Sequence, residues 1–166
     1  MIAMRFLLAA TLLGSLALPA IGQNKYTGPR PPKPDMVYLL HASELVPTEA
    51  GDAKEETRKD VVANVMKGVA SSARTPLAEP IFLIATEKLD AEKFELYKMD
   101  TKNGQREVVI PTDPKKRAKN APKPLRLKWE KIETGLFRLE ANEYLENGEY
   151  CLSPSGSQQV FCFQVY

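Results

Sequence analysis

The residue with the widest chemical repertoire in this 166-residue chain is its single histidine, His41. An imidazole can bind a metal ion or transfer a proton near neutral pH, but both roles need partner groups. The sequence has no second histidine, no H-E-x-x-H spacing and no cysteine-rich cluster that would supply further metal ligands. We therefore predict a structural or surface role for His41, with no metal site, no cofactor and no catalytic residue.

A serine nucleophile needs an adjacent base, and no serine of this chain lies in the G-x-S-x-G pattern of many hydrolases. Five serines lie in turn-like contexts, namely Ser71, Ser72, Ser153, Ser155 and Ser157. Side chains that are distant in sequence can still meet in a cleft. A hydrolase whose site is assembled from scattered Asp, Glu, Ser and His41 therefore stays open as an alternative function.

The two cysteines, Cys151 and Cys162, have two interpretations: a cross-strand disulfide or two unpaired thiols in separate environments. They fall at opposed positions of a predicted terminal hairpin, which brings their β-carbons near bonding distance but often strains the bond. The C-x-x-C spacing of redox enzymes is absent. We keep both interpretations and predict no catalytic redox role.

The strongest local charge bias is the run KKRAK, which contributes Lys115, Lys116, Arg117 and Lys119. Such a run can contact anionic lipid, lipopolysaccharide or an acidic glycan, although most charge runs are solvated loops. Globally, 23 Lys and Arg stand against 21 Asp and Glu, a formal charge of +2. This near-balance gives no electrostatic basis for nucleic-acid binding.

The N-terminal residues 1–22 have the layout of a secretory signal peptide: Arg5, then an apolar run, then small residues. The apolar run is too short for a membrane-spanning helix, so we predict no transmembrane anchor in the mature chain. We expect export to the periplasm or the medium. Residues 23–35 form a proline-rich leader, exposed or docked on the fold, and residues 36–166 are one domain of ordinary size.

Short apolar or alternating runs bounded by turn residues predict the strands of this domain. We expect them at residues 36–46, 80–88, 93–99, 105–110, 125–132, 136–142, 144–153 and 158–166, with a loop in the polar stretch after residue 46 and another at 111–124. Residues 52–70 fit both an amphipathic helix and a valine-rich strand, and we favour the strand. The pattern predicts an antiparallel β-sandwich of immunoglobulin-like type with eight or nine short strands.

Two turns give the best local signals. Asn103-Gly104 supplies the two positive φ angles of a type I′ hairpin between residues 93–99 and 105–110. If Gly156 and Ser157 form the loop of the last hairpin, Leu152 lies opposite Phe161 and Tyr150 opposite Phe163, on one apolar face. The same register places the two cysteines opposite one another.

The closing pattern LENGEYCLSPSGSQQVFCFQV and the segment TPLAEPIFLI resemble a group of small secreted bacterial proteins of unknown function. Those proteins have an all-β domain that ends in a Gly-Glu-Tyr hairpin and a Phe-rich last strand. The resemblance implies an exported all-β module and no particular activity. We expect a non-catalytic module that binds a protein or a cell-envelope component, with a secreted hydrolase as the alternative.

Overall fold

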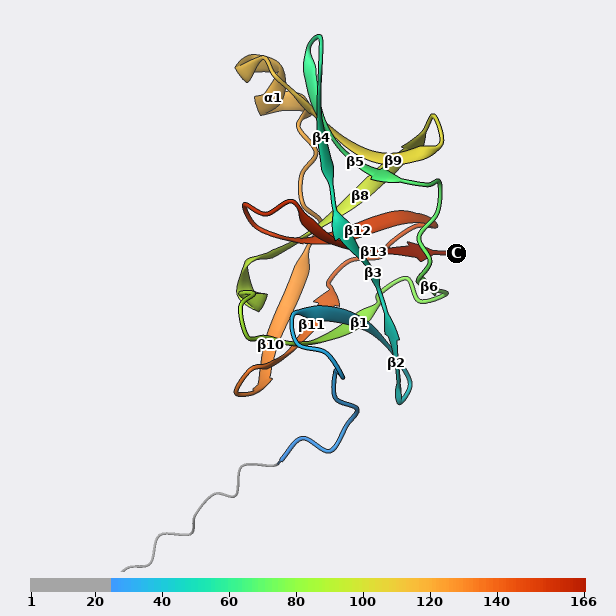
Figure 1. Cartoon of the computed structure of the whole chain (residues 1–166), viewed down its shortest axis with the longest axis vertical. Helices are drawn as coiled ribbons and strands as arrows, with labels where there is room; N and C mark the ends of the chain where they lie inside the picture. The colour runs from blue at the N-terminus through green and yellow to red at the C-terminus, as the bar shows by residue number, and fades with distance from the viewer. Residues whose placement is uncertain (1–24) are drawn as a thin grey trace, which may run out of the picture.

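The computed structural model describes residues 25–166 and shows an all-β protein with two sheets and one short α-helix (Figure 1). Pairing is antiparallel except where the two-residue strand β6 (Arg74–Thr75) joins β13 (Gln159–Val165) in parallel. The predicted signal peptide and the first two leader residues lie outside the described residues. No helix in residues 25–166 is long and apolar enough to cross a membrane. The predicted all-β class with antiparallel sheets is confirmed.

The first sheet has five strands. In spatial order they are β10 (Leu127–Glu133), β11 (Leu136–Ala141), β7 (Ile81–Ala85), β1 (Met36–His41) and β2 (Glu44–Pro47). The central strand β7 is hydrogen-bonded on both sides. Its residues Phe82, Leu83 and Ile84 are almost completely buried, which explains the unbroken apolar run in its sequence.

The second sheet is larger and curled. In spatial order its path is β3 (Glu49–Asp52), β13, β12 (Gly148–Pro154), β8 (Phe94–Lys102), β9 (Gln105–Pro111), β5 (Val61–Lys67) and β4 (Lys54–Arg58). Because only Ala53 separates β3 from β4, the two ends of this path are almost one run of chain, and the sheet forms a half-barrel. A Cβ added to Gly51 would lie 3.0 Å from the Met66 side chain, so glycine permits the close approach inside the curl.

The two faces of the terminal β12–β13 hairpin belong to different cores. The register pairs Tyr150 with Phe163 and Leu152 with Phe161, as predicted, and these side chains lie between the two sheets. Cys151 and Cys162 are paired on the opposite face, inside the curl of the second sheet. Since successive strand residues point to opposite faces, one hairpin stabilises both cores.

The ambiguous segment 52–70 forms strands, so the favoured interpretation is confirmed and the helical one is wrong. Strand β5 is paired with β4 on one side and with β9 on the other. Its backbone groups are therefore satisfied by two neighbouring strands, and Ala63 and Val65 are buried. Tertiary pairing outweighs the local helical spacing of the valines.

The chain has thirteen strands within residues 25–166, more than the eight or nine predicted. The predicted strand at residues 36–46 is divided by a turn at Ala42, whose φ is +54°, into the β1–β2 hairpin. The predicted loop in the polar stretch after residue 46 is wrong, because that stretch contains β3 and β4. Asp52, Lys54 and Glu55 are exposed while the backbones of the two strands complete the curled sheet, so the composition concealed the strands.

The predicted loop at residues 111–124 is also wrong in part, because it contains the helix α1 (Pro114–Asn120). The Asp113 side chain caps the helix by accepting from the backbone N–H groups of Lys115 and Lys116. Proline at the first helical position has a fixed φ that suits a helix and lacks only an N–H that would have no intrahelical partner. The cap and the proline start the helix, although none of its residues is buried.

The described part of the proline-rich leader is attached to the fold at both ends. Near its start, Glu133 accepts the backbone N–H of Tyr26 at 2.9 Å and the Arg30 guanidinium at 2.7 Å. At its end, the Asp35 carboxylate accepts three consecutive backbone N–H groups, from residues 87, 88 and 89. These contacts connect the leader to the first sheet.

Candidate functional site

A cavity of about 250 Å³ lies on the concave face of the second sheet. Its walls come from β5, β8, β9, β12 and β13, and the segment that begins in α1 and the β12–β13 turn lie at its mouth. Since alternate strand residues share a face, Glu95, Tyr97 and Met99 of β8 all face it. The cavity therefore follows from the curl of the sheet.

The floor of the cavity is apolar. Met99, Val108 and Val160 line it together with Cys151, which is bonded to Cys162 in a disulfide. The disulfide confirms the first of the two interpretations for the cysteines. Met99 Sδ contacts Cys151 Sγ, and both cysteines are at most 4% exposed. An apolar molecular surface would replace water here without losing hydrogen bonds.

One wall carries a hydrogen-bonded pair from β8. The Tyr97 hydroxyl donates to Glu95 Oε2 at 3.0 Å. Burial and this hydrogen bond raise the pKa of Tyr97 to about 12, so the phenol stays neutral and donates. Nearby, Ser153 Oγ donates to the backbone carbonyl of Gln159 at 3.2 Å. Both hydroxyl groups are thus engaged with protein acceptors.

The opposite wall offers an unused acceptor. Asn64, on β5, lines the cavity, and its Oδ1 atom is buried without a hydrogen-bond partner among the described residues. Leaving a buried amide oxygen unpaired costs about 1–3 kcal/mol. A ligand hydroxyl or N–H group that reached Asn64 would remove this cost.

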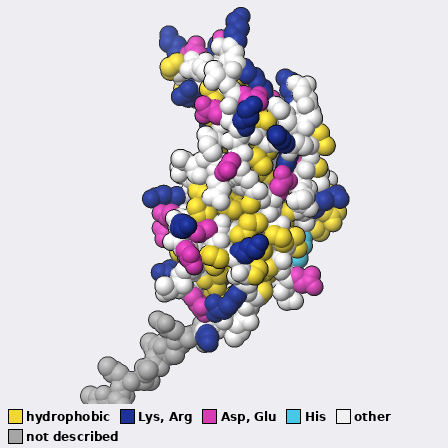
Figure 2. Space-filling view, in the orientation of Figure 1, with side chains coloured by type: hydrophobic (Ala, Val, Ile, Leu, Met, Phe, Trp, Pro, Cys, Tyr) yellow, Lys and Arg dark blue, Asp and Glu magenta, His cyan; other side chains and the backbone are white. Residues whose placement is uncertain are grey.

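The mouth of the cavity carries an arginine. Arg117 of α1 lines it, and its Nε donates to the backbone carbonyl of Pro111 at 3.0 Å. The neighbouring Lys115, Lys116 and Lys119 are exposed on the same short helix and do not line the cavity. Several Lys and Arg side chains lie at the end of the molecule that carries α1, with Asp and Glu side chains among them (Figure 2). The structure thus places Arg117, one residue of the predicted basic run, at a cavity that the sequence did not predict.

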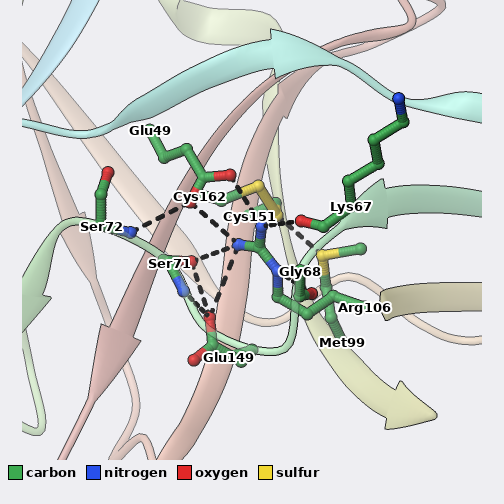
Figure 3. A network of polar contacts seen from close by, with 10 residues as sticks. All are labelled: Glu49, Lys67, Gly68, Ser71, Ser72, Met99, Arg106, Glu149, Cys151 and Cys162. Atoms are coloured by element: carbon green, nitrogen blue, oxygen red, sulfur yellow. Dashed lines mark hydrogen bonds and ion pairs between the residues drawn. A yellow bond between two sulfur atoms is a disulfide. The ribbon is translucent and has the colours of Figure 1, made fainter. Parts of the chain in front are cut away.

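A buried ion network closes the other end of the concave face (Figure 3). Arg106 is 1% exposed, and its guanidinium donates twice to Glu49, at 2.7 and 3.2 Å, and once to Ser71 Oγ, at 2.6 Å. It also donates to the carbonyls of Lys67 and Gly68. All five N–H donors of the guanidinium therefore have acceptors.

The buried Glu149 completes the network from β12. Its Oε2 accepts the Ser71 backbone N–H at 2.9 Å and the Ser71 hydroxyl at 2.6 Å, and lies 3.7 Å from Arg106 Nη1. The network fixes the β5–β6 loop against β9, β3 and β12. Sequence reasoning missed it, although Arg106 alternates in phase with Val108 and Ile110, which places an arginine on an inward face.

His41 lies away from the cavity, on β1 of the first sheet. Its Nε2 is 3.0 Å from Thr75 Oγ1, and that oxygen also accepts the backbone N–H of Leu77. Within residues 25–166 no cluster of His, Cys, Asp and Glu side chains has the arrangement of a metal site. The structure gives His41 a contact that anchors β6.

Comparisons of the chain with protein-family models, with characterised proteins and with solved structures give no match. The curled sheet, its cavity and the arginine at the cavity mouth are consequently the features that can support a function.

Proposed function

We propose that this chain is an exported, non-catalytic β-sandwich module that binds a component of the cell envelope, a small amphiphilic molecule held in the cavity. The observation that carries the proposal is the cavity itself. It has an apolar floor at Met99, Val108 and Val160, and polar groups on its walls. Ligand sites in proteins combine these features, and a volume of about 250 Å³ is slightly below the roughly 300–1,000 Å³ of sites for drug-sized ligands, which suits a small ligand.

The polar groups of the walls support binding more than hydrolysis. A serine hydrolase needs a hydroxyl next to a base, whereas Ser153 donates to a backbone carbonyl. Glu95 accepts from Tyr97, a phenol whose raised pKa keeps it protonated. Neither arrangement prepares a nucleophile. The unpaired Oδ1 of Asn64 would serve a ligand hydroxyl group.

The cellular location belongs to the same proposal. The signal-like residues 1–22 support export, and a disulfide is compatible with an oxidising compartment outside the cytoplasm. The likeness of the terminal hairpin to small secreted bacterial proteins, and an immunoglobulin-like arrangement of the two sheets, are further parts of the proposal. A protein partner at an exposed strand is the competing form of the binding hypothesis.

The test is a titration of the ¹⁵N-labelled mature chain with 1-octanol, followed by amide chemical shifts. Each buried methylene contributes about 0.8 kcal/mol, so we expect saturable binding in the micromolar-to-millimolar range from the apolar chain alone. The shift changes should concentrate on Asn64, Tyr97 and residues 151–160.

Two matched variants of β9 complete this experiment. Val108→Trp puts an indole into the cavity, whereas Val109→Trp adds the same group at a half-buried position on the opposite face of the strand. We expect Val108→Trp to weaken octanol binding at least tenfold and Val109→Trp to leave it within twofold. Absence of saturable binding, or equal effects of the two variants in folded protein, would reject the cavity as the binding site.

A further inference from the structure

The arginines of residues 25–166 differ in one respect that concerns the cavity mouth. Five of them form ion pairs with carboxylates: Arg30, Arg58, Arg106, Arg126 and Arg138. A sixth, Arg74, stacks on the Tyr166 ring at 4.3 Å. Arg117 has neither kind of partner among the described residues, and this is the arginine that lines the cavity.

One backbone contact orients the exposed Arg117 side chain. Its Nε donates to the Pro111 carbonyl at 3.0 Å, and both terminal nitrogens are free of hydrogen bonds to residues 25–166. Two parallel N–H groups of a guanidinium match the two oxygens of a carboxylate or phosphate group. An oriented guanidinium without an anion, at the mouth of an apolar cavity, is suited to an anionic ligand.

The local sequence favours the same class of ligand. From residue 114 to residue 123 the chain carries five Lys and Arg residues but no Asp or Glu. This segment contains α1, so its positive charges lie close to Arg117, although the whole chain has a formal charge of only +2. Such a cluster of positive charges attracts anions and repels organic cations.

The apolar floor determines which way round the ligand lies. Met99, Val108 and Val160 have no group that could compensate a buried charge, so an anionic group would be costly there and a hydrocarbon is accepted. Glu95 is paired with Ser153 beside the β12–β13 turn, so its carboxylate lies toward the mouth and reduces the preference for an anion without reversing the cost of burying one. The anionic group is therefore favoured at the mouth beside Arg117, with the apolar body inside.

We infer that the cavity binds an amphiphile with an anionic oxygen head group, a carboxylate or a phosphate, whose head pairs with Arg117 while its apolar body covers the Met99–disulfide floor. This inference rests on the proposed function, since it names the ligand class for the same cavity. Charge-assisted hydrogen bonds at a partly solvated guanidinium predict a moderate preference, about fivefold over an uncharged head.

The experiment compares four ligands of equal chain length: octanoate, octyl phosphate, 1-octanol and octylamine. Each is titrated into the ¹⁵N-labelled mature chain at neutral pH and low salt. We expect octanoate and octyl phosphate to bind about fivefold more tightly than octanol, and octylamine to bind least. Whichever anion binds better identifies the head group, and either order agrees with the inference.

Variants separate the role of Arg117 from general charge. Arg117→Gln should remove the preference for octanoate over octanol and leave octanol affinity unchanged, whereas Arg117→Lys should keep part of the preference. The control Lys128→Gln removes the same charge from an exposed position on β10, and we expect it to change no affinity by more than twofold.

The outcomes distinguish the two proposals. Equal affinities for octanoate and octanol, tighter binding of octylamine, or equal effects of Arg117→Gln and Lys128→Gln would overturn the anionic head group and leave the binding cavity standing. Failure of all four ligands to bind the folded protein would reject the cavity as a ligand site as well.

Discussion

Replacing Arg106 with methionine should destabilise the fold more than most single changes in this chain. The guanidinium is 1% exposed and donates to Glu49, Ser71 and two backbone carbonyls. Methionine fills similar space but leaves these acceptors unpaired and leaves the buried Glu149 without its nearby cation. Removing one partner of a buried ion pair costs about 3–5 kcal/mol. We expect a loss of that size, equivalent to a decrease of about 10–15 °C in Tm.

The measurement is urea unfolding followed by far-ultraviolet circular dichroism. Trp129 is 43% exposed, so its fluorescence is a weaker reporter. Arg106→Lys keeps the charge but not the five donors, and we expect a loss of about 2 kcal/mol. The control is Lys128→Met on β10, an exposed position where we expect a change within about 0.5 kcal/mol.

A double-mutant cycle tests the cause of the loss. If the buried charge of Glu149 is responsible, adding Glu149→Gln to Arg106→Met should recover at least about 1 kcal/mol, because the remaining side chain is neutral. A loss below about 1 kcal/mol in Arg106→Met, or strictly additive effects of the two changes, would refute the assignment of the network as a major stabilising feature.

Two further predictions concern the disulfide and the leader. Replacing both Cys151 and Cys162 with alanine removes a bridge between residues separated by 11 positions, which should lower the free energy of unfolding by about 3 kcal/mol in urea titrations. The hydrogen bond from Arg30, assisted by the Tyr26 amide, lowers the pKa of Glu133. At a pH above the ordinary glutamate pKa, this ion pair therefore stabilises the docked leader, and the stabilisation is lost as the pH falls through the lowered pKa of Glu133. Replacing Arg30 with glutamine should raise the pKa of Glu133, which a carboxyl NMR titration would measure.

The predictions for the disulfide and for the leader contact can each be contradicted by one measurement. Two titratable thiols in the purified, denatured and unreduced protein would show that the cysteines are not bonded. An unchanged Glu133 titration in the Arg30→Gln protein would show that the leader contact does not form in solution, and Lys33→Gln is the matched control because Lys33 forms no ion pair among the described residues.

The concave face of the second sheet has three zones with different roles. The Arg106 network closes one end, the disulfide and Met99 form the middle, and the cavity reaches solvent beside Arg117. The stability experiments and the binding experiments therefore address opposite ends of one structural unit.

Turn residues and strand alternation in the sequence predicted the β8–β9 and β12–β13 hairpins. Asn103 and Gly104 have φ angles of +53° and +78°, so the predicted turn forms because these residues tolerate that conformation. In the last hairpin, the predicted register pairs Cys151 with Cys162 correctly, although the turn centres on Ser155 and Gly156 and not on the predicted Gly156 and Ser157. Both predictions depend on residues close together in the chain, where the period of two and the turn type fix the register.

The candidate site was only partly predictable. The sequence identified Arg117 within a basic run, but it gave no sign that this arginine lines a cavity. The cavity walls come from segments between residues 53 and 160, and their spacing depends on how tightly the second sheet curls. Strand alternation tells which residues share a face; it does not tell which distant strand that face meets.

The sequence by itself thus determined the strand faces, the turns and the opposed cysteines, because each depends on neighbours along the chain. The tertiary structure alone decided that Arg106 meets Glu49, 57 residues away, and that β3 and β4 complete a half-barrel from a segment of loop-like composition. Contacts between distant segments form only when many strands associate together. The cavity and its ion network are products of that association, and no local pattern encodes them.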